Sequence, residues 1–255
     1  MRRDWTFVLA TDLDGTFLGG SEAERHALYR WIEARRREVG LIFVSGRDPE
    51  FITELCDGGV PWPDFVIGDV GTTIAAVEAN EAGRQIVPLT PLEADIAARW
   101  NDAGPRVRAA LDGAAGLRLQ PTEFRYRVSY DYAPDAFDPT ALGRIEALGL
   151  DVLISADRFL DVLPPGVSKG PSLLRLLDHL ALPGERVLVA GDTLNDLSMF
   201  ETGLPGAVVG GAEPALLERV QDIASARPCR GIGAAGIAEA IAAFGLHPTP
   251  PLCNA

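Results

Sequence analysis

Residues 6–16 read T-F-V-L-A-T-D-L-D-G-T, an apolar run followed at once by two aspartates. Residues 187–196 repeat the pattern as V-L-V-A-G-D-T-L-N-D. Short, β-branched apolar runs are typical of buried parallel strands, and ligands in open α/β sheets bind just beyond the carboxyl ends of such strands. Four carboxylates at one edge of a sheet would repel one another, so they predict a bound hard cation, with Mg2+ as the first candidate. The four are Asp12, Asp14, Asp192 and Asp196.

Strand-like and helix-like segments alternate through the first third of the chain and again through its last third. Short apolar runs mark the strands, and amphipathic stretches between them mark the helices. In order, we expect a strand at 6–10, a helix at 21–38, a strand at 41–44, a helix at 49–56, a strand at 65–67, a helix at 171–180, a strand at 187–190, a helix at 196–201, a strand at 207–209, a helix from 214 and a last helix at 237–244. This alternation predicts an α/β fold with a Rossmann-like, doubly wound parallel sheet.

The middle of the chain has a different character. Residues 91–111 show the pattern of one long amphipathic helix and residues 139–148 that of a shorter one. Short strands are expected at 86–89, 118–120, 125–132, 152–155 and 159–163. Helices beside hairpin-like strands, inside a parallel α/β chain, suggest an inserted α+β domain. We place the core at residues 1–83 and 159–255 and the insertion at 84–158.

The composition predicts a globular protein and argues against nucleic acid or an anionic membrane as a partner. Of the 255 residues 47% are hydrophobic and 23% charged, and the net charge is −13 with no run of Lys and Arg. No apolar stretch reaches transmembrane length, and Arg2-Arg3 precedes only about five apolar residues, so we expect a cytoplasmic protein. The three cysteines are scattered and form neither a disulfide framework nor a metal motif; they are Cys56, Cys229 and Cys253.

The first aspartate pair permits phosphoryl chemistry. Asp12 and Asp14 are two residues apart, so on an extended segment both side chains point to the same side. A carboxylate beside a metal ion can attack phosphorus, and a second carboxyl group can protonate the leaving oxygen and then activate water. Gly15 allows a sharp exit from the strand, and Thr16 can cap the next turn or donate a hydrogen bond to an anion.

Two further segments are candidates for binding a phosphoryl group. Ser45-Gly46 follows the strand 41–44, so its hydroxyl and backbone N–H groups can hold a phosphate at the start of a helix. Lys169 follows the break at Pro164-Pro165, where it would supply the fixed positive charge that four carboxylates and a phosphate require. Ordinary roles also fit both, because Ser-Gly is common in turns and a lone lysine is usually solvated.

The chain resembles the haloacid dehalogenase superfamily. The four ordered motifs of that superfamily match D-L-D-G-T at 12–16, Ser45, Lys169 and G-D-T-L-N-D at 191–196. The insertion lies between the second and third motifs, as in members that carry a C2-type cap. The resemblance implies that Asp12 is the nucleophile, forming an aspartyl phosphate, and that Asp14 is the general acid and base.

The same resemblance implies the remaining site residues. Phosphate binding is expected from Thr16, Ser45, Gly46, Lys169 and Asn195, the last as an orienting group. Mg2+ binding is expected from Asp12, the backbone carbonyl of Asp14, Asp192 and Asp196.

A finer resemblance concerns the segment after the third strand. Residues 68–74, G-D-V-G-T-T-I, are similar to the V-G-T segment of sucrose-phosphate and mannosylfructose-phosphate phosphatases, whereas general sugar phosphatases tend to carry Asn-Gly-Ala there. Residues 126–130 and 160–170 also resemble that subgroup. The sugar stays open, because Arg127 stands where the plant and cyanobacterial sucrose enzymes typically have Lys. Candidate substrate-binding cations are Arg47, Arg125 and Arg127.

The resemblance therefore implies a Mg2+-dependent phosphatase for a phosphorylated sugar. The expected substrate is a disaccharide phosphate such as sucrose-6-phosphate or mannosylfructose-phosphate. A hexose-phosphate phosphatase or a phosphomutase of the same superfamily is the near alternative, and a non-catalytic sugar-phosphate-binding module is the remote one. The expected partner is thus a small-molecule sugar phosphate, and the expected state is a monomer or a small homo-oligomer.

Residues 231–236, G-I-G-A-A-G, match the dinucleotide-binding fingerprint. The fingerprint needs a strand before it, and residues 226–230 include Pro228 and do not suggest one. We interpret these residues as a glycine-rich segment that leads into the last helix.

Residues 166–170, G-V-S-K-G, match the elbow of serine hydrolases around Ser168, and Asp192 and His247 follow in the Ser-Asp-His order of that fold. Pro164-Pro165 would end the required strand early, and His247 lies in a Pro-rich tail that we expect to fray. A serine-hydrolase site would also leave both aspartate pairs unexplained.

Overall fold

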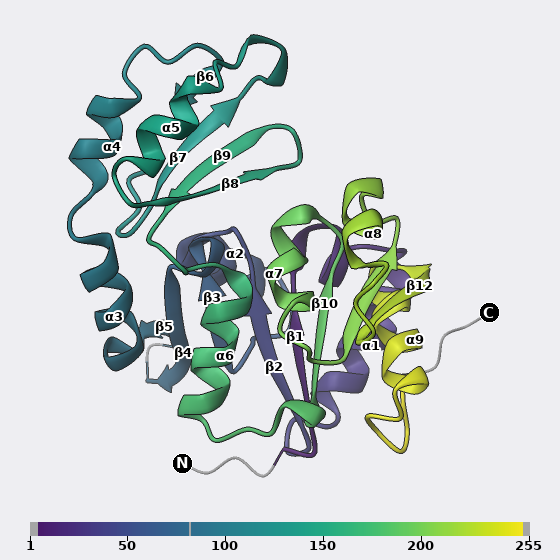
Figure 1. Ribbon diagram of the computed structural model, residues 1–255. Helices are drawn as coiled ribbons and strands as arrows, with labels where there is room; N and C mark the ends of the chain where they lie inside the picture. Colours follow the sequence, from purple (N-terminus) through teal and green to yellow (C-terminus); the bar gives the residue numbers. More distant parts are fainter. Residues whose placement is uncertain (1–4, 82, 252–255) are drawn as a thin grey trace. The chain divides into compact units, whose positions relative to one another are not determined.

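The two aspartate-bearing strands lie side by side in the computed structural model, which describes residues 5–81 and 83–251. β1 (Phe7–Thr11) pairs in parallel with β10 (Val187–Gly191), and both strands are buried throughout, as expected for strands covered on both faces. Among the described residues they belong to an eight-stranded sheet (Figure 1). Its order is β12 (Ala226–Ile232), β11 (Gly206–Gly210), β10, β1, β2 (Val39–Val44), β3 (Phe65–Gly68), β4 (Thr73–Asn80) and β5 (Gly83–Pro88).

The predicted doubly wound parallel sheet is confirmed for the strands from β12 to β3, which all pair in parallel. β4 and β5 extend the sheet as an antiparallel hairpin. Helices cover both faces of this sheet. α1, α2 and α9 pack into one apolar cluster with β1 and β2, while α6 and α7 lie in front of the sheet in Figure 1. The helices of this unit are α1 (Glu22–Glu33), α2 (Pro49–Asp57), α6 (Lys169–His179), α7 (Leu197–Phe200), α8 (Pro214–Val220) and α9 (Ala234–Ala243).

The first helix begins where its capping signal predicts but ends earlier. The Ser21 hydroxyl accepts a hydrogen bond from the N–H of Glu24, whose carboxylate accepts from the N–H of Ser21, which completes a capping box. The helix was expected to reach residue 38 and instead ends at Glu33. Arg35 then turns the chain, because its carbonyl accepts the N–H groups of both Glu38 and Val39, and β2 starts at the latter.

Residues 226–230 lie in a strand, β12, which corrects the expectation that they do not. β12 is the last strand of the sheet order, and an edge strand tolerates Pro228 because its missing N–H breaks no ladder between two partners. The glycines that follow are explained by close packing. A Cβ on Gly233 would lie 2.2 Å from the backbone of Gly19, and a Cβ on Gly236 would lie 2.4 Å from the carbonyl of Gly231.

The smaller unit contains an antiparallel sheet with helices beside it, as predicted for an inserted α+β segment. The predicted helix 91–111 is two helices, because Asn101 and Asp102 adopt left-handed backbone conformations that end the first. The sheet order is β6 (Leu117–Leu119), β7 (Val128–Tyr132), β9 (Phe159–Leu163) and β8 (Asp151–Ser155). The helices are α3 (Thr90–Trp100), α4 (Gly104–Ala110) and α5 (Thr140–Glu146).

The chain divides into these two units at Leu89 and Ser168. The expected limits of the insertion were 84 and 158. The difference at the first limit arises because β5 pairs with β4 in the larger unit. The difference at the second arises because β9 pairs with β7 and β8 in the smaller unit.

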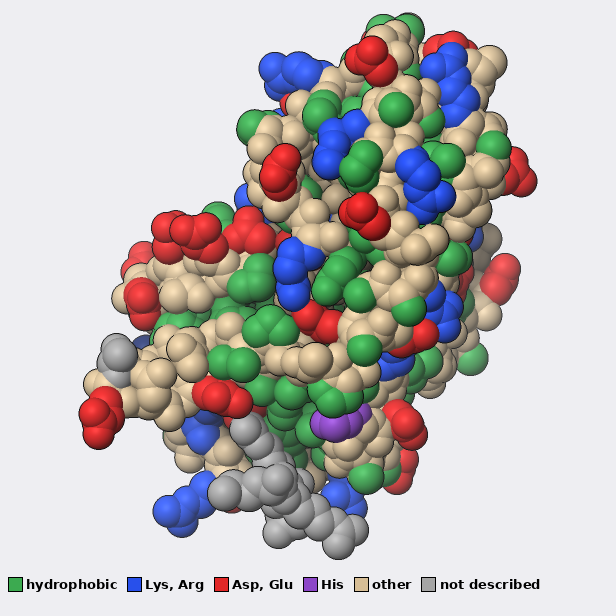
Figure 2. Space-filling view, turned by 90° about the vertical axis from the view of Figure 1, so that its left-hand side faces the viewer, with side chains coloured by type: hydrophobic (Ala, Val, Ile, Leu, Met, Phe, Trp, Pro, Cys, Tyr) green, Lys and Arg blue, Asp and Glu red, His purple; other side chains and the backbone are tan. Residues whose placement is uncertain are grey.

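The segment after α9 packs against α1, although it was expected to fray. His247 is buried, and the indole N–H of Trp31 donates to the carbonyl of Thr249 at 2.7 Å. Cys56 and Cys229 are buried and are not joined to each other by a disulfide, and Cys253 lies outside the described residues. None of the described helices is long and apolar enough to cross a membrane. On the face drawn in Figure 2, described Lys and Arg side chains stand between acidic and apolar ones and form no large basic patch.

Candidate active site

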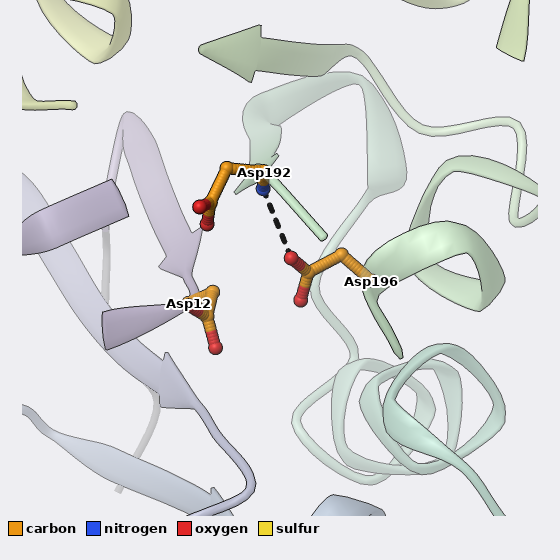
Figure 3. A group of neighbouring side chains, drawn as sticks. All are labelled: Asp12, Asp192 and Asp196. Atoms are coloured by element: carbon orange, nitrogen blue, oxygen red, sulfur yellow. Dashed lines mark hydrogen bonds between the residues drawn. The ribbon is translucent and has the colours of Figure 1, made fainter. Parts of the chain in front are cut away.

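Three carboxylates come together where β1 and β10 end. Asp12 follows β1, Asp192 follows β10, and Asp196 ends the short turn Leu194–Asp196. One oxygen of each carboxylate lies within 4.8 Å of the other two, and Figure 3 shows the three side chains gathered from these segments. The structure therefore brings together three of the four predicted acids, and the side chain of Asp14 lies apart from this group. The donors are all hard oxygens, the type that Mg2+ prefers.

Lys169 neutralises part of this acidic cluster. Its ammonium group is fully buried and donates to Asp12 Oδ1 at 2.7 Å, Asn195 Oδ1 at 2.8 Å and Asp196 Oδ1 at 2.6 Å. An ammonium group has three N–H donors, so these contacts satisfy it completely. Burial opposes the charge, but Asp12 and Asp196 outweigh that effect and raise the pKa of Lys169. The lysine is therefore a fixed cation at neutral pH.

The position of Lys169 depends on the residues that follow it. A Cβ on Gly170 would lie 1.9 Å from the backbone oxygen of Ser198, so only glycine lets the start of α6 approach α7 this closely. The N–H of Gly170 donates to Ser198 Oγ at 3.0 Å. Ser172 Oγ donates to the carbonyl of Gly71 at 2.6 Å. These contacts hold the first turn of α6 against the acidic cluster.

The carboxylates of Asp12 and Asp192, directly after β1 and β10, are hard to ionise without a further cation. Burial raises the pKa of Asp12 to about 8, and Lys169 opposes this shift. Burial likewise raises the pKa of Asp192 to about 6, and the hydroxyl of Thr16 opposes it by donating to Asp192 Oδ1 at 2.6 Å. Thr16, which was predicted to bind phosphate, thus fixes a carboxylate in this structure. A Cβ on Gly15 would lie 2.2 Å from Asp192 Oδ2, so glycine is required there for contact as well as for its positive φ.

The loop after β10 is held by two acids. Asp196 Oδ2 accepts the backbone N–H groups of Asp192 at 2.9 Å and Thr193 at 3.0 Å. Glu213, which sequence reasoning missed, accepts the N–H of Leu194 at 2.9 Å and donates its own N–H to the carbonyl of Asp192. The sequence signal that could have identified Glu213 is an acid that follows β11 and directly precedes the first proline of α8. Two carboxylates that satisfy loop N–H groups make this edge rigid before any ligand binds.

The Ser45 segment lies against a strained loop. Asp69 and Val70 both have positive φ, 52° and 60°, which is costly for a β-branched residue. The N–H of Val70 donates to the carbonyl of Ser45 at 3.1 Å, and Thr73 Oγ1 donates to Asp69 Oδ2 at 2.5 Å. A Cβ on Gly46 would meet a methyl group of Val70 at 3.8 Å. The strained loop therefore packs against the candidate phosphate-binding segment.

Asp14 pairs with Arg47. The guanidinium group donates from Nε to Asp14 Oδ2 at 2.8 Å and from Nη2 to Asp14 Oδ1 at 3.1 Å. Hydrogen bonding to Asp14 raises the pKa of Arg47 further above its usual range. The ring of Phe51 lies 4.4 Å from the guanidinium carbon. Arg47, which the sequence predicts to bind substrate, contacts the candidate acid and base in this structure.

The two candidate arginines of the smaller unit both form ion pairs inside that unit. Arg127 is only 6% exposed, and its Nη1 donates to Asp161 Oδ1 at 2.9 Å, the oxygen that Ser129 Oγ also contacts. Arg125 donates twice to the buried carboxylate of Glu93, at 2.8 and 2.9 Å. The burial of Arg127 favours a role in holding this sheet together over contact with a sugar.

The alternative serine-hydrolase constellation is not assembled. Asp192 is held by Thr16, and His247 Nε2 lies 3.3 Å from a carboxylate oxygen of Glu38 on the chain after α1. His247 also contacts the ring of Trp31 edge to face. The histidine is thus a packed residue of the segment after α9.

Comparisons with known proteins agree with this geometry. The family model described as sucrose-6F-phosphate phosphohydrolase matches residues 5–245. Mannosylfructose-phosphate phosphatase of Agrobacterium fabrum is 31% identical over 94% of this chain and 98% of its own length. Glucosylglycerol-phosphate synthase of Pseudomonas anguilliseptica is 41% identical over 93% of this chain, which spans only 31% of that protein. The sucrose-phosphatase of Synechocystis sp. PCC6803, solved with sucrose and phosphate, superimposes with a TM-score of 0.81 at 27% identity, over 96% of this chain and 99% of that one.

Proposed function

Because the chain belongs to the sucrose-6F-phosphate phosphohydrolase family of haloacid dehalogenase phosphatases, we propose that it hydrolyses a disaccharide phosphate such as sucrose-6-phosphate or mannosylfructose-phosphate through an aspartyl phosphate. One observation carries the proposed chemistry. A buried lysine touches both Asp12 and Asp196 while a third acid, Asp192, completes the cluster. Phosphoryl transfer needs a nucleophile, a fixed cation and an anion-tolerant site, and this arrangement has all three.

The first step would form the covalent intermediate. A carboxylate oxygen of Asp12 attacks phosphorus, and the bond from phosphorus to the sugar oxygen breaks. Asp14, as a carboxylic acid, gives its proton to that departing oxygen. Lys169 balances negative charge at Asp12, and the Ser45 hydroxyl would donate to a phosphoryl oxygen.

The second step would regenerate the enzyme. Water attacks the phosphorus of the aspartyl phosphate and loses a proton to the Asp14 carboxylate, and the bond between phosphorus and the Asp12 oxygen breaks. Inorganic phosphate leaves, and Asp12 returns as a carboxylate. Asp14 thus acts first as acid and then as base.

Magnesium fits the donor set at this edge. Asp12, Asp192 and Asp196 would hold the ion with the backbone carbonyl of Asp14, and one oxygen of each of the three carboxylates lies within 4.8 Å of the other two. When bound, the ion would neutralise charge on the phosphoryl oxygens and on the acids themselves. Burial raises the pKa values of Asp12 and Asp192, and a bound cation would favour the charged form of both carboxylates.

Magnesium is expected to raise the melting temperature of the metal-free protein. A ligand present at 100 times its dissociation constant stabilises the folded state by about 2.7 kcal/mol. Differential scanning fluorimetry after EDTA treatment, with and without MgCl2, measures the shift. Asp192→Asn should reduce it strongly, whereas Asp178→Asn, an exposed change on α6, should leave it intact. An equal shift in all three proteins would rule out the proposed ligand set.

A substrate panel tests the proposed function directly. Release of inorganic phosphate from sucrose-6-phosphate, mannosylfructose-phosphate, glucosylglycerol-phosphate and hexose 6-phosphates should be Mg2+-dependent and show the highest kcat/KM for a disaccharide phosphate. A preference for hexose 6-phosphates would favour the broader sugar phosphatase. Transfer between sugar positions without free phosphate would indicate a phosphomutase. Sugar-phosphate binding without hydrolysis would indicate a non-catalytic module. The cytoplasmic location and the oligomeric state, a monomer or a small homo-oligomer, stay predictions.

A further inference from the structure

We propose that Arg47 is a positioning residue that fixes the carboxylate of Asp14, with Phe51 holding the guanidinium in turn. The proposal rests on the proposed role of Asp14 as acid and base. Arg47 would then act on the reaction through Asp14, whereas the sequence alone predicts direct contact with the substrate.

The side chain of Asp14 depends on Arg47 for its orientation. The side chain is 55% exposed. The backbone around it is non-helical, with ψ of 125° at Asp14 and φ of 78° at Gly15. An exposed aspartate on such a turn has several rotamers of similar energy. The bidentate contact from Arg47, at 2.8 and 3.1 Å, engages both carboxylate oxygens and selects one orientation.

Arg47 is itself held at three points. Its backbone N–H donates to Ser45 Oγ at 3.2 Å, and its carbonyl accepts the N–H of Asp69 at 3.0 Å. Its guanidinium lies over the ring of Phe51, whose own backbone N–H caps onto Asp48 at the start of α2. The loop after β2 and the first turn of α2 therefore fix the group that orients Asp14.

This arrangement places the effect of Arg47 on catalysis rather than on binding. Two of the five guanidinium N–H donors contact Asp14, one face of the group lies over Phe51, and Lys169 already supplies buried positive charge at the nucleophile. A proton donor displaced by about 1 Å can lose on the order of 10²-fold in rate. The loss should concern the steps that need a proton at Asp14, namely departure of a sugar oxygen and activation of water.

Arg47→Gln is expected to lower kcat for sucrose-6-phosphate by about 10²-fold with little change in KM. With p-nitrophenyl phosphate, whose phenolate leaves without a proton, the first turnover should stay near the wild-type rate and hydrolysis should become slow. Stopped-flow absorbance would then show a burst of one nitrophenolate per enzyme. Phe51→Leu should give a weaker version of the same pattern, and Arg47→Lys should recover part of kcat.

Two controls separate positioning from a structural role. In an Asp14→Asn background, Arg47→Gln should change the residual kcat by less than about twofold, because its target is already disabled. Arg219→Gln breaks an exposed pair between α8 and Glu201, the residue after α7, and should leave kcat and the burst unchanged. The melting temperature of each variant identifies any variant that unfolds. If Arg47→Gln unfolds, Phe51→Leu tests the positioning role instead.

Three results would overturn the proposal: a rise in KM at constant kcat, an equal loss with both substrates and no burst, or a full additional loss in the Asp14→Asn background. The first would make Arg47 a direct substrate contact. None of them bears on Asp12, so failure of this inference is distinct from failure of the proposed function, which an active Asp12→Asn variant would reveal.

Discussion

Replacing Asp12 with asparagine is expected to reduce kcat by at least about 10⁴-fold while the protein stays folded. Asparagine has the shape of aspartate but cannot act as the attacking carboxylate, so the covalent intermediate cannot form. Phosphate release from the best substrate of the panel measures the loss. Circular dichroism and the melting temperature measure the fold. Because Asp196 and Asn195 still accept from Lys169, the buried ammonium keeps two of its three partners.

Two control variants are needed to interpret this result. Asp178→Asn makes the same chemical change at an exposed position of α6 and should leave kcat within about twofold of the wild type. Ser168→Ala removes the nucleophile of the alternative serine-hydrolase interpretation and should also stay active. An Asp12→Asn protein with near wild-type activity, together with an inactive Ser168→Ala protein, would show that the nucleophile is misassigned.

The placement of the acids was predictable because it follows from strand ends alone. A buried apolar run ending in aspartate puts that aspartate at the carboxyl edge of a parallel sheet, whichever strand lies beside it. Asp12 and Asp192 followed this rule, and Lys169 met them because a helix start also lies at that edge. The order of the motifs along the chain predicts the catalytic role of each of these residues, and those roles stay proposals until they are tested.

The pairing of side chains was not predictable in the same way. The sequence predicts Arg47 and Arg127 as substrate-binding cations, and it does not predict that Arg47 contacts Asp14 or that Arg127 is buried against Asp161. Which acid an arginine meets depends on how loops and strands from distant parts of the chain lie together, and sequence spacing carries no such information. β12 was missed for a related reason, since a strand containing Pro228 is stable only at a sheet edge.

Replacing Lys169 with methionine is expected to have the largest effect on stability. Methionine fills similar space but leaves Asp12, Asp192 and Asp196 crowded together without their buried counter-charge. Removing one partner of a buried ion pair typically costs about 3–5 kcal/mol. Urea unfolding in EDTA measures this loss as a lower midpoint at unchanged slope. Turnover should also fall, because the fixed cation at the nucleophile is gone.

Adding Mg2+ distinguishes a lost counter-charge from a lost packing contact. If charge is the cause, Mg2+ should restore much of the stability of Lys169→Met, because the cation takes over part of the neutralisation, while turnover stays low. The double variant Lys169→Met with Asp196→Asn should unfold in EDTA at a higher urea concentration than Lys169→Met alone, since one repelling charge is removed. If neither Mg2+ nor the second substitution recovers stability, Lys169 acts mainly through its packed side chain. The electrostatic account of the cluster would then be wrong, even though the distances from its ammonium group are short.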